Sequence, residues 1–262
     1  MEIIKSKVNE NIKIITKLNT STSFRKKQGL FVVEGARLCS DALQTGAKIK
    51  KFFYTEKAME NYSEKISPLI EKAEKSFIIS EEISTHLSQT QSPQGVFCVV
   101  EMLDKNESNY KINKDGVYII LENVQDPANL GAVCRTAEAL GVDGVFVSGG
   151  CDIYNPKAQR AAMGSLFRIN VFETDDIIET IRMLKSYGIT VSASTPREDA
   201  LDIAEFSEKY KGVACVIGNE GNGVTEKTFS VCDCLVTIPM RGRAESLNAS
   251  VAASIIMYQL MK

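Results

Sequence analysis

The sequence contains a single histidine, His86, and no tryptophan among its 262 residues. One histidine argues against a His-rich zinc site or a carboxylate–histidine–metal centre. No apolar run approaches the roughly 20 residues that a membrane-spanning helix needs. The first residues, MEIIKSKVNENIKII, also lack the continuous apolar core and small-residue cleavage site of a secretory signal. We therefore expect a cytoplasmic protein with no membrane partner.

The seven cysteines include no CxxC pair, and most of them lie inside apolar runs. This pattern is typical of buried free thiols in a reducing compartment rather than of a disulfide framework. Cys232 and Cys234 are two residues apart, so in a strand their side chains would share a face. That spacing alone is weak evidence for a metal, and we expect no metal site.

Charge is unevenly distributed along the chain. The apolar fraction of 44% and charged fraction of 24% are ordinary for a globular protein, and the net charge of −2 does not indicate a nucleic-acid partner. Residues 1–51, however, carry eleven basic and four acidic side chains, whereas residues 111–262 carry fifteen and nineteen. The net charge of +7 at the start of the chain indicates either a binding surface for an anionic polymer or a solvated lysine-rich surface.

A polar stretch near residues 103–115 predicts a boundary between two halves with β/α patterning. We expect a smaller α/β domain at 1–105, a linker at 106–115 and a second α/β domain at 116–262. In the first half, the predicted strands are Phe31–Val33, Lys50–Tyr54, Ser76–Ile79 and Val96–Met102, and the predicted helices are Asn9–Leu18, Ala36–Gln44 and Ala58–Lys75.

The second half alternates continuous apolar runs with helical patterns, which predicts a parallel sheet covered on both faces. The predicted strands are Val117–Glu122, Gly144–Val147, Ile169–Phe172, Thr190–Ala193, Val213–Gly218 and Leu235–Ile238. The predicted helices are Leu130–Leu140, Pro156–Leu166, Asp176–Tyr187 and Ser246–Met261. Ligands bind such sheets beyond the carboxyl ends of the strands. The candidate ligand loops are therefore Asn123–Asn129, Ser194–Arg197, Asn219–Val224 and Pro239–Asn248.

Glycines punctuate the loop NEGNGV, which follows the strand VACVIG. The order GxxGxG is the reverse of the GxGxxG of dinucleotide-binding folds, so a nicotinamide-dependent oxidoreductase is disfavoured. A ligand loop and a tight structural turn fit this loop equally well. Glu220 lies between the glycines although a turn does not require a carboxylate there.

Two further segments carry polar residues next to helices. In IPMRGRAESLNASVAA, Ser246 is a good N-cap for the last long helix. In NVQDPANLGAVCRTA, Asn129 can cap a helix that carries Arg135 among apolar neighbours. An arginine there must reach a carboxylate, a phosphate or the surface.

These three segments, in this order, resemble the SpoU (TrmH) family of RNA ribose 2′-O-methyltransferases. Asn129 and Arg135 match its first signature, Gly218, Asn219, Glu220 and Gly223 match the Gly-Asn-Glu-x-x-Gly turn, and Ile238–Ala253 matches IPMxGxxxSLNxSxA with Ala249 in place of the usual Val. The segment Tyr154–Phe167 resembles the sequences of the family branch that modifies ribosomal RNA. The likeness covers residues 117–262.

The resemblance implies an S-adenosylmethionine cofactor, a deep trefoil knot in the catalytic domain, and a homodimer in which the catalytic arginine can come from the partner subunit. It implies a catalytic set of Arg135, Asn129, Glu220, Ser246 and Asn248. The implied cofactor-binding residues are Ser194, Thr195, Pro196, Gly218, Asn219, Glu220, Gly221, Gly223, Ile238, Pro239, Met240, Ser246, Leu247 and Asn248. The second half has no histidine, so we expect Arg135 to hold a phosphate and stabilise the alkoxide while a phosphate oxygen or water takes the proton.

The first half is similar to a small α/β substrate-binding module that is common in this family and related to ribosomal proteins. The stretch from Phe24 to Arg37 carries this likeness and coincides with the basic segment. It implies RNA contacts by Arg25, Lys26, Lys27 and Arg37. We expect ribosomal RNA, most readily that of the large subunit, as the substrate. The alternatives are a methyltransferase that acts on transfer RNA and a non-catalytic RNA-binding protein of the same fold.

Overall fold

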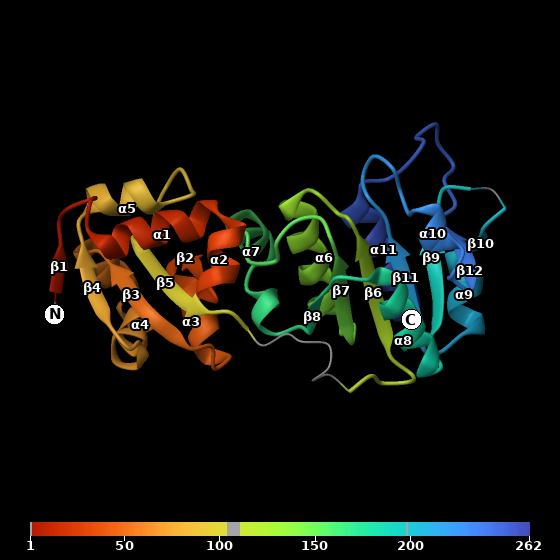
Figure 1. Cartoon of the computed structure of the whole chain (residues 1–262), viewed down its shortest axis with the longest axis horizontal. Coiled ribbons are helices and arrows are strands. Elements are labelled where there is room, and N and C mark those ends of the chain that lie inside the picture. The colour runs from red at the N-terminus through yellow and green to blue at the C-terminus, as the bar shows by residue number, and fades with distance from the viewer. Residues whose placement is uncertain (1, 104–110, 198) are drawn as a thin grey trace. The chain divides into compact units, whose positions relative to one another are not determined.

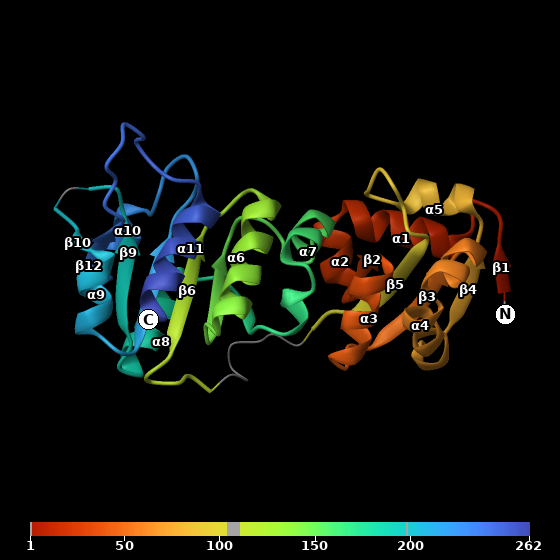
Figure 2. The ribbon, with the colours of Figure 1, turned by 180° about the vertical axis from the view of Figure 1, so that it is seen from behind.

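The computed structural model describes residues 2–103, 111–197 and 199–262. It contains two compact units, unit 1 with Met1–Asp104 and Tyr154–Phe167, and unit 2 with Lys105–Ile153 and Arg168–Lys262 (Figures 1 and 2). Part of the predicted linker at 106–115 lies outside the described residues, and the predicted domain boundaries stay a prediction. Within the described residues, no helix is long and apolar enough to cross a membrane.

Unit 1 is built on a five-stranded mixed sheet with the order β1-β4-β3-β5-β2. β5 runs antiparallel to β2 and β3, whereas β3, β4 and β1 are parallel. The strands are β1 (Glu2–Ile4), β2 (Leu30–Glu34), β3 (Ile49–Tyr54), β4 (Ser76–Ile79) and β5 (Val96–Glu101). The helices are α1 (Glu10–Thr20), α2 (Thr22–Gln28), α3 (Ala36–Gln44), α4 (Glu56–Lys72) and α5 (Glu81–Leu87).

One core of unit 1 lies between the sheet and α1. Ile12, Ile15 and Leu18 recur every third residue, so they fall on one side of α1, and all three are fully buried. They pack with Phe53 and Phe97 of the sheet. The four strands predicted in this half, at 31–33, 50–54, 76–79 and 96–102, correspond to β2, β3, β4 and β5. The short polar helices α2 and α5 and the three-residue β1 were not predicted.

The segment Tyr154–Phe167 groups with unit 1 although the chain on both sides of it belongs to unit 2. It contains α7 (Pro156–Ala162) and the 3-10 turn η2 (Ser165–Phe167). The ring of Phe31 on β2 lies 4.6 Å from that of Tyr154, and Gln159 Nε2 donates to the Val32 carbonyl at 3.0 Å. This grouping differs from the predicted domain at 116–262, which ran through the segment without a break.

Unit 2 contains a seven-stranded parallel sheet with the order β10-β12-β9-β11-β6-β7-β8. This confirms the predicted α/β class with a parallel sheet. The strands are β6 (Val117–Glu122), β7 (Gly144–Ser148), β8 (Val171–Thr174), β9 (Thr190–Ser194), β10 (Leu201–Asp202), β11 (Val213–Ile217) and β12 (Cys234–Thr237). The helices are α6 (Pro127–Leu140), α8 (Ile177–Ser186), α9 (Ile203–Lys209), α10 (Glu226–Phe229) and α11 (Ala249–Leu260).

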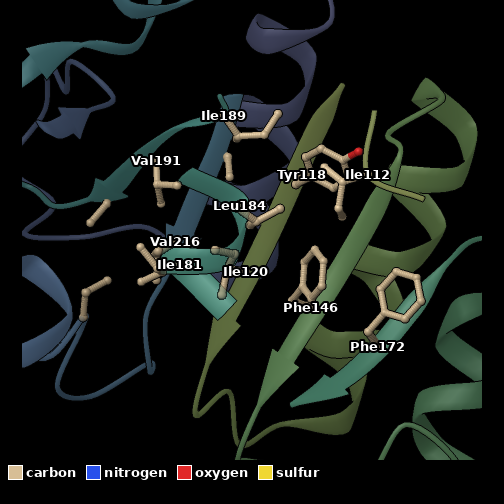
Figure 3. Close-up of a cluster of buried hydrophobic side chains, with 13 residues drawn as sticks. Ile112, Tyr118, Ile120, Phe146, Phe172, Ile181, Leu184, Ile189, Val191 and Val216 are labelled. Carbon is tan, nitrogen blue, oxygen red and sulfur yellow. The ribbon is translucent and has the colours of Figure 1, made fainter. Parts of the chain in front are cut away.

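Helices cover both faces of this sheet, with α8 on one side and α6 and α11 on the other (Figures 1 and 2). β6 and β11 are buried along their whole length, as expected for central strands of a parallel sheet. Tyr118 and Ile120 of β6 pack with Phe146 of β7 and with Ile181 and Leu184 of α8 (Figure 3). This core fixes the strands whose carboxyl ends carry the candidate site.

Candidate active site

A cavity of about 410 Å³ lies at the carboxyl ends of β9, β11 and β12. Its volume is within the range of small-molecule and cofactor pockets. Three of the four predicted ligand loops line it, together with the start of α11. Twelve of the fourteen residues implied as cofactor-binding are among its walls, and Pro239 and Asn248 are not: the twelve are Ser194, Thr195, Pro196, Gly218, Asn219, Glu220, Gly221, Gly223, Ile238, Met240, Ser246 and Leu247.

The cavity also has walls beyond the residues implied as cofactor-binding. They are Ile217, Asn222, Val224, Glu226, Phe229, Val236, Thr237, Ala249, Ala252 and Ile256. Ala252 and Ile256 are four residues apart on α11, so they share a helix face. The sequence of α11 is apolar on most sides, and it therefore gave no signal for which face would line a pocket. The walls combine an apolar surface with a few polar groups, which suits a ligand with both an aromatic base and charged ends.

The turn after β11 is closed by its own backbone. Asn219 N–H donates to the Gly223 carbonyl at 3.0 Å, and Gly223 N–H donates back to the Asn219 carbonyl at 2.9 Å. Gly223 has φ of +67°, which favours glycine. A Cβ on Gly218 would lie 2.1 Å from the carbonyl carbon of Gly223. Gly218 is therefore required for the close approach of the two ends of the turn.

Glu220 reaches from this turn to the beginning of α6. Its carboxylate accepts hydrogen bonds from the backbone N–H groups of Gln125 and Asp126 and from Asn129 Nδ2, the last at 2.8 Å. Burial raises the pKa of Glu220, but these hydrogen bonds, that of Asn129 first, outweigh it, and the pKa lies below its usual value. The carboxylate is thus ionised at neutral pH and serves as an acceptor that fastens the turn to α6.

The structure corrects both predicted helix caps. Asp126, not Asn129, is the N-cap of α6, and Asn129 is buried within its first turns. Asn248, not Ser246, is the N-cap of α11, where its side chain accepts from Ser250 N–H and Val251 N–H. An asparagine two residues further on satisfies the first amides of α11, which leaves Ser246 exposed on the cavity wall.

Asn129 links residues from all three motifs. Its Nδ2 donates to Glu220, and its Oδ1 accepts from Asn248 Nδ2 at 3.0 Å. These hydrogen bonds therefore link the loop after β6, the turn after β11 and the start of α11. Of the five residues implied as catalytic, Asn129 thus holds two others, Glu220 and Asn248, in a positioning arrangement.

Arg135 does not take part in this hydrogen-bond network. It is exposed on α6, and it makes no hydrogen bond or ion pair with any residue that the structure describes. It is also not among the residues that line the cavity. The structure therefore does not bring Arg135 to the cavity of its own chain.

Cys151 lies beside the loop after β6, where its backbone N–H donates to the Val124 carbonyl at 3.0 Å. Burial, assisted by the nearby carboxylates of Asp152, Glu220 and Asp126, raises the pKa of the Cys151 thiol to about 11. The thiolate is the reactive form of cysteine. Cys151 therefore stays protonated at neutral pH and is not a nucleophile for this site.

In unit 1, the structure corrects one residue of the predicted RNA-contacting set. Arg25 is only 2% exposed, and its guanidinium donates to the Leu18 carbonyl and to Thr22 Oγ1. It joins α1 to α2 and is not available to RNA in this conformation. Lys26 and Lys27, at the end of α2, and Arg37, on α3, are exposed, and their RNA contacts stay a prediction.

Comparisons with known proteins agree with this geometry. The family model described as the SpoU rRNA Methylase family matches residues 116–258, and the model of an MRM3-like substrate binding domain matches residues 9–98. The 23S rRNA (guanosine(2553)-2′-O)-methyltransferase RlmP of Bacillus subtilis is 29% identical over 99% of both chains. The 23S rRNA (uridine(2479)-2′-O)-methyltransferase of Streptomyces viridochromogenes is 27% identical over 91% of this chain and 84% of its own.

Comparison with solved structures also finds a SpoU methyltransferase. The crystal structure of the SpoU methyltransferase AviRb from Streptomyces viridochromogenes, in complex with the cofactor AdoMet, superposes with a TM-score of 0.85 at 26% sequence identity. The match covers 97% of this chain and 98% of that one. Both units are therefore shared with that protein.

Proposed function

The chain belongs to the SpoU rRNA methylase family, and on this basis we propose that it transfers a methyl group from S-adenosylmethionine to a ribose 2′-hydroxyl of 23S ribosomal RNA. The observation that carries the proposal is the cavity at the carboxyl ends of β9, β11 and β12, which is walled by the family's own motifs. An rRNA substrate agrees with the cytoplasmic localisation expected from the sequence.

The residues of the cavity fit S-adenosylmethionine. Gly218 and Gly223 bring backbone close to the space that a ligand would fill, and a Cβ at 218 would collide with the turn. Val236, Leu247 and Ile256 supply apolar walls for an adenine, while backbone groups and Thr195 supply polar contacts at the edges. We assign the cofactor to these walls.

When bound, S-adenosylmethionine supplies an electrophilic methyl group on a sulfonium, which leaves the thioether S-adenosylhomocysteine after transfer. The ribose oxygen gains that methyl group and loses its proton. An arginine such as Arg135 is a poor general base, because guanidinium groups are not deprotonated in proteins. We assign it the task of holding the target phosphate and stabilising the developing alkoxide, with a phosphate oxygen or water accepting the proton. Asn129, Glu220 and Asn248 position the loops around this step.

We propose that the enzyme acts as a homodimer in which Arg135 serves the cavity of the partner subunit. Its exposure and its absence from the walls of its own cavity support this arrangement. α11 also presents an exposed apolar face, with Val251, Ile255 and Tyr258 at 47%, 39% and 58% exposure and at helical spacing. Such a face is typical of a surface that another chain covers. Light scattering at micromolar protein should give the mass of a dimer.

The substrate-binding model over residues 9–98 and the 23S rRNA named for two relatives favour ribosomal over transfer RNA. The relatives act on a guanosine and a uridine, so we propose no particular nucleotide. The trefoil knot stays a prediction from the resemblance. The test is methyl transfer in vitro with unmethylated 23S rRNA and, separately, with bulk tRNA. We expect incorporation into 23S rRNA; incorporation only into tRNA, or tight RNA binding without transfer, would favour the alternatives.

Gly218 provides a test of the cofactor cavity. In the Gly218→Ala variant, the new methyl group would collide with the backbone of Gly223 and Val224 at 2.1–2.4 Å, so the turn must open. Overpacking of this kind costs about 1–3 kcal/mol, and we expect the affinity for S-adenosylhomocysteine to fall roughly tenfold to a hundredfold. Calorimetric titration measures it. Gly242→Ala is the matched control, since a Cβ there meets nothing within 4 Å. Equal affinities of the two variants would contradict the assignment of the cavity.

A further inference from the structure

The arginines of unit 2 divide into two groups. Arg168, Arg182 and Arg197 are held by the carboxylates of Glu138, Glu179 and Asp199, respectively. The other three arginines, Arg135, Arg241 and Arg243, are exposed and make no hydrogen bond or ion pair with any described residue. Arg135 already has a role in the proposed function, whereas Arg241 and Arg243 have none.

Arg241 and Arg243 lie on the loop between β12 and α11, which rises beyond the end of the sheet in Figure 1. Both ends of this loop belong to the cofactor cavity, because Met240 on one side and Ser246 on the other are among its walls. Residues 241–245 therefore form part of the rim of the cavity. A Cβ on Gly242 would meet no described atom within 4 Å, so there is open space beside the backbone between the two arginines.

Within the part of the chain that the structure describes, no carboxylate forms an ion pair with Arg241 or Arg243. Glu245 is two residues from Arg243 and is exposed, yet no ion pair joins them among the described residues. The region 111–262 is acidic overall, with nineteen acidic and fifteen basic residues. A guanidinium whose N–H donors are not engaged by a carboxylate can still make bidentate hydrogen bonds to phosphate oxygens. Two such groups at the rim create a local positive site on an otherwise acidic unit.

We propose that Arg241 and Arg243 bind backbone phosphates of the RNA beside the nucleotide that enters the cavity. This inference rests on the proposed function, and it adds a second RNA-contacting surface, in unit 2, to the one expected in unit 1. The two arginines hold the RNA chain at the rim, so that the 2′-hydroxyl is presented to the cavity. They contribute to RNA affinity and not to cofactor affinity, because their side chains are not among the cavity walls.

The test compares the double variant R241Q/R243Q with R168Q/R182Q, which loses the same charge from arginines that are already paired. Binding of unmethylated 23S rRNA, purified from cells that lack the gene, is measured by filter binding across a series of potassium chloride concentrations. For R241Q/R243Q we expect the Kd for RNA to rise at least about tenfold and the slope of log K against log salt to fall by about 1–2. R168Q/R182Q is expected to stay close to wild type.

Calorimetric titration with S-adenosylhomocysteine checks that R241Q/R243Q is folded, and we expect its affinity to be unchanged. R241K/R243K keeps the charge without the fork, so it should recover most of the salt slope and only part of the affinity. A wild-type Kd and slope in R241Q/R243Q, or equal losses in R168Q/R182Q, would overturn the proposal. Because the readout is binding, it is distinct from failure of the proposed function, which would appear as absence of methyl transfer by the wild-type protein.

Discussion

The Arg135→Ala enzyme is expected to lose about 10²–10³ in kcat, because removing a donor that stabilises a developing oxyanion has an effect of this size. Arg135 is exposed, unpaired among the described residues and absent from the cavity walls, so the substitution should not disturb folding. The affinity for S-adenosylhomocysteine should therefore equal that of wild type. Single-turnover methyl transfer to unmethylated 23S rRNA, together with calorimetric titration, measures both quantities.

Two further variants sharpen this test. Arg135→Lys keeps the charge but loses the planar fork, and we expect it to remain badly impaired. Arg182→Ala removes a similar side chain from α8, where it pairs with Glu179 on the surface, and should leave kcat unchanged. If Arg135→Ala turned over at the wild-type rate, Arg135 would have no part in the chemistry and the assignment would fail.

The second large effect is expected from mixing two inactive proteins. Arg135→Ala keeps its cavity but lacks the arginine, while Thr195→Trp keeps the arginine but fills a cavity wall with a large side chain. Each homodimer should be nearly inactive. In a hybrid of the proposed dimer, the open cavity of one subunit would meet the arginine of the other, so one of the two sites would be complete and we expect about half of the wild-type activity to return.

The hybrid is isolated by co-expression with two different affinity tags and sequential purification on both. Its rate is compared with each parent and with a doubly tagged wild-type dimer. An arginine that serves its own subunit would leave the hybrid as inactive as its parents, because neither subunit then holds a complete site. The same preparation reports on dimerisation, since without a stable dimer no protein would carry both tags.

Much of unit 2 could be predicted from the sequence because its central strands are buried on both sides. β6 and β11 are runs of five or six buried residues, VYIILE and VACVI, and such runs leave little freedom of interpretation. The short polar helices α2 and α5 were not predicted, because TSFRKKQ and EEISTHL carry too few apolar residues to show a helical period.

Details of the site depended on tertiary contacts that a sequence does not display. Ser246 and Asn129 are both good caps by residue type, but Asn248 and Asp126 occupy those positions. Asn129 is instead inside α6, where Glu220, 91 residues away, accepts a hydrogen bond from its amide. Arg25 lies in a basic run and was expected to contact RNA, yet its buried guanidinium donates to a nearby helix carbonyl and a threonine hydroxyl.

The motifs nevertheless identified the cavity well. Glycines and polar residues directly after β9, β11 and β12 must meet at one edge of a parallel sheet, and the loops do converge there. What the motifs could not supply was the contribution of Phe229 and of Ile256, which look like ordinary core positions. The separation of Arg135 from the cavity is likewise a property of the folded chain.

The most direct measurement is a map of ribose 2′-O-methylation in the ribosomal and transfer RNA of cells with and without the gene. We predict that one 2′-O-methyl group disappears from 23S rRNA when the gene is removed. It should return when the wild-type gene is supplied, and not when the Arg135→Ala gene is supplied. Unchanged ribose methylation in both RNAs, or a loss confined to tRNA, would contradict the proposed function.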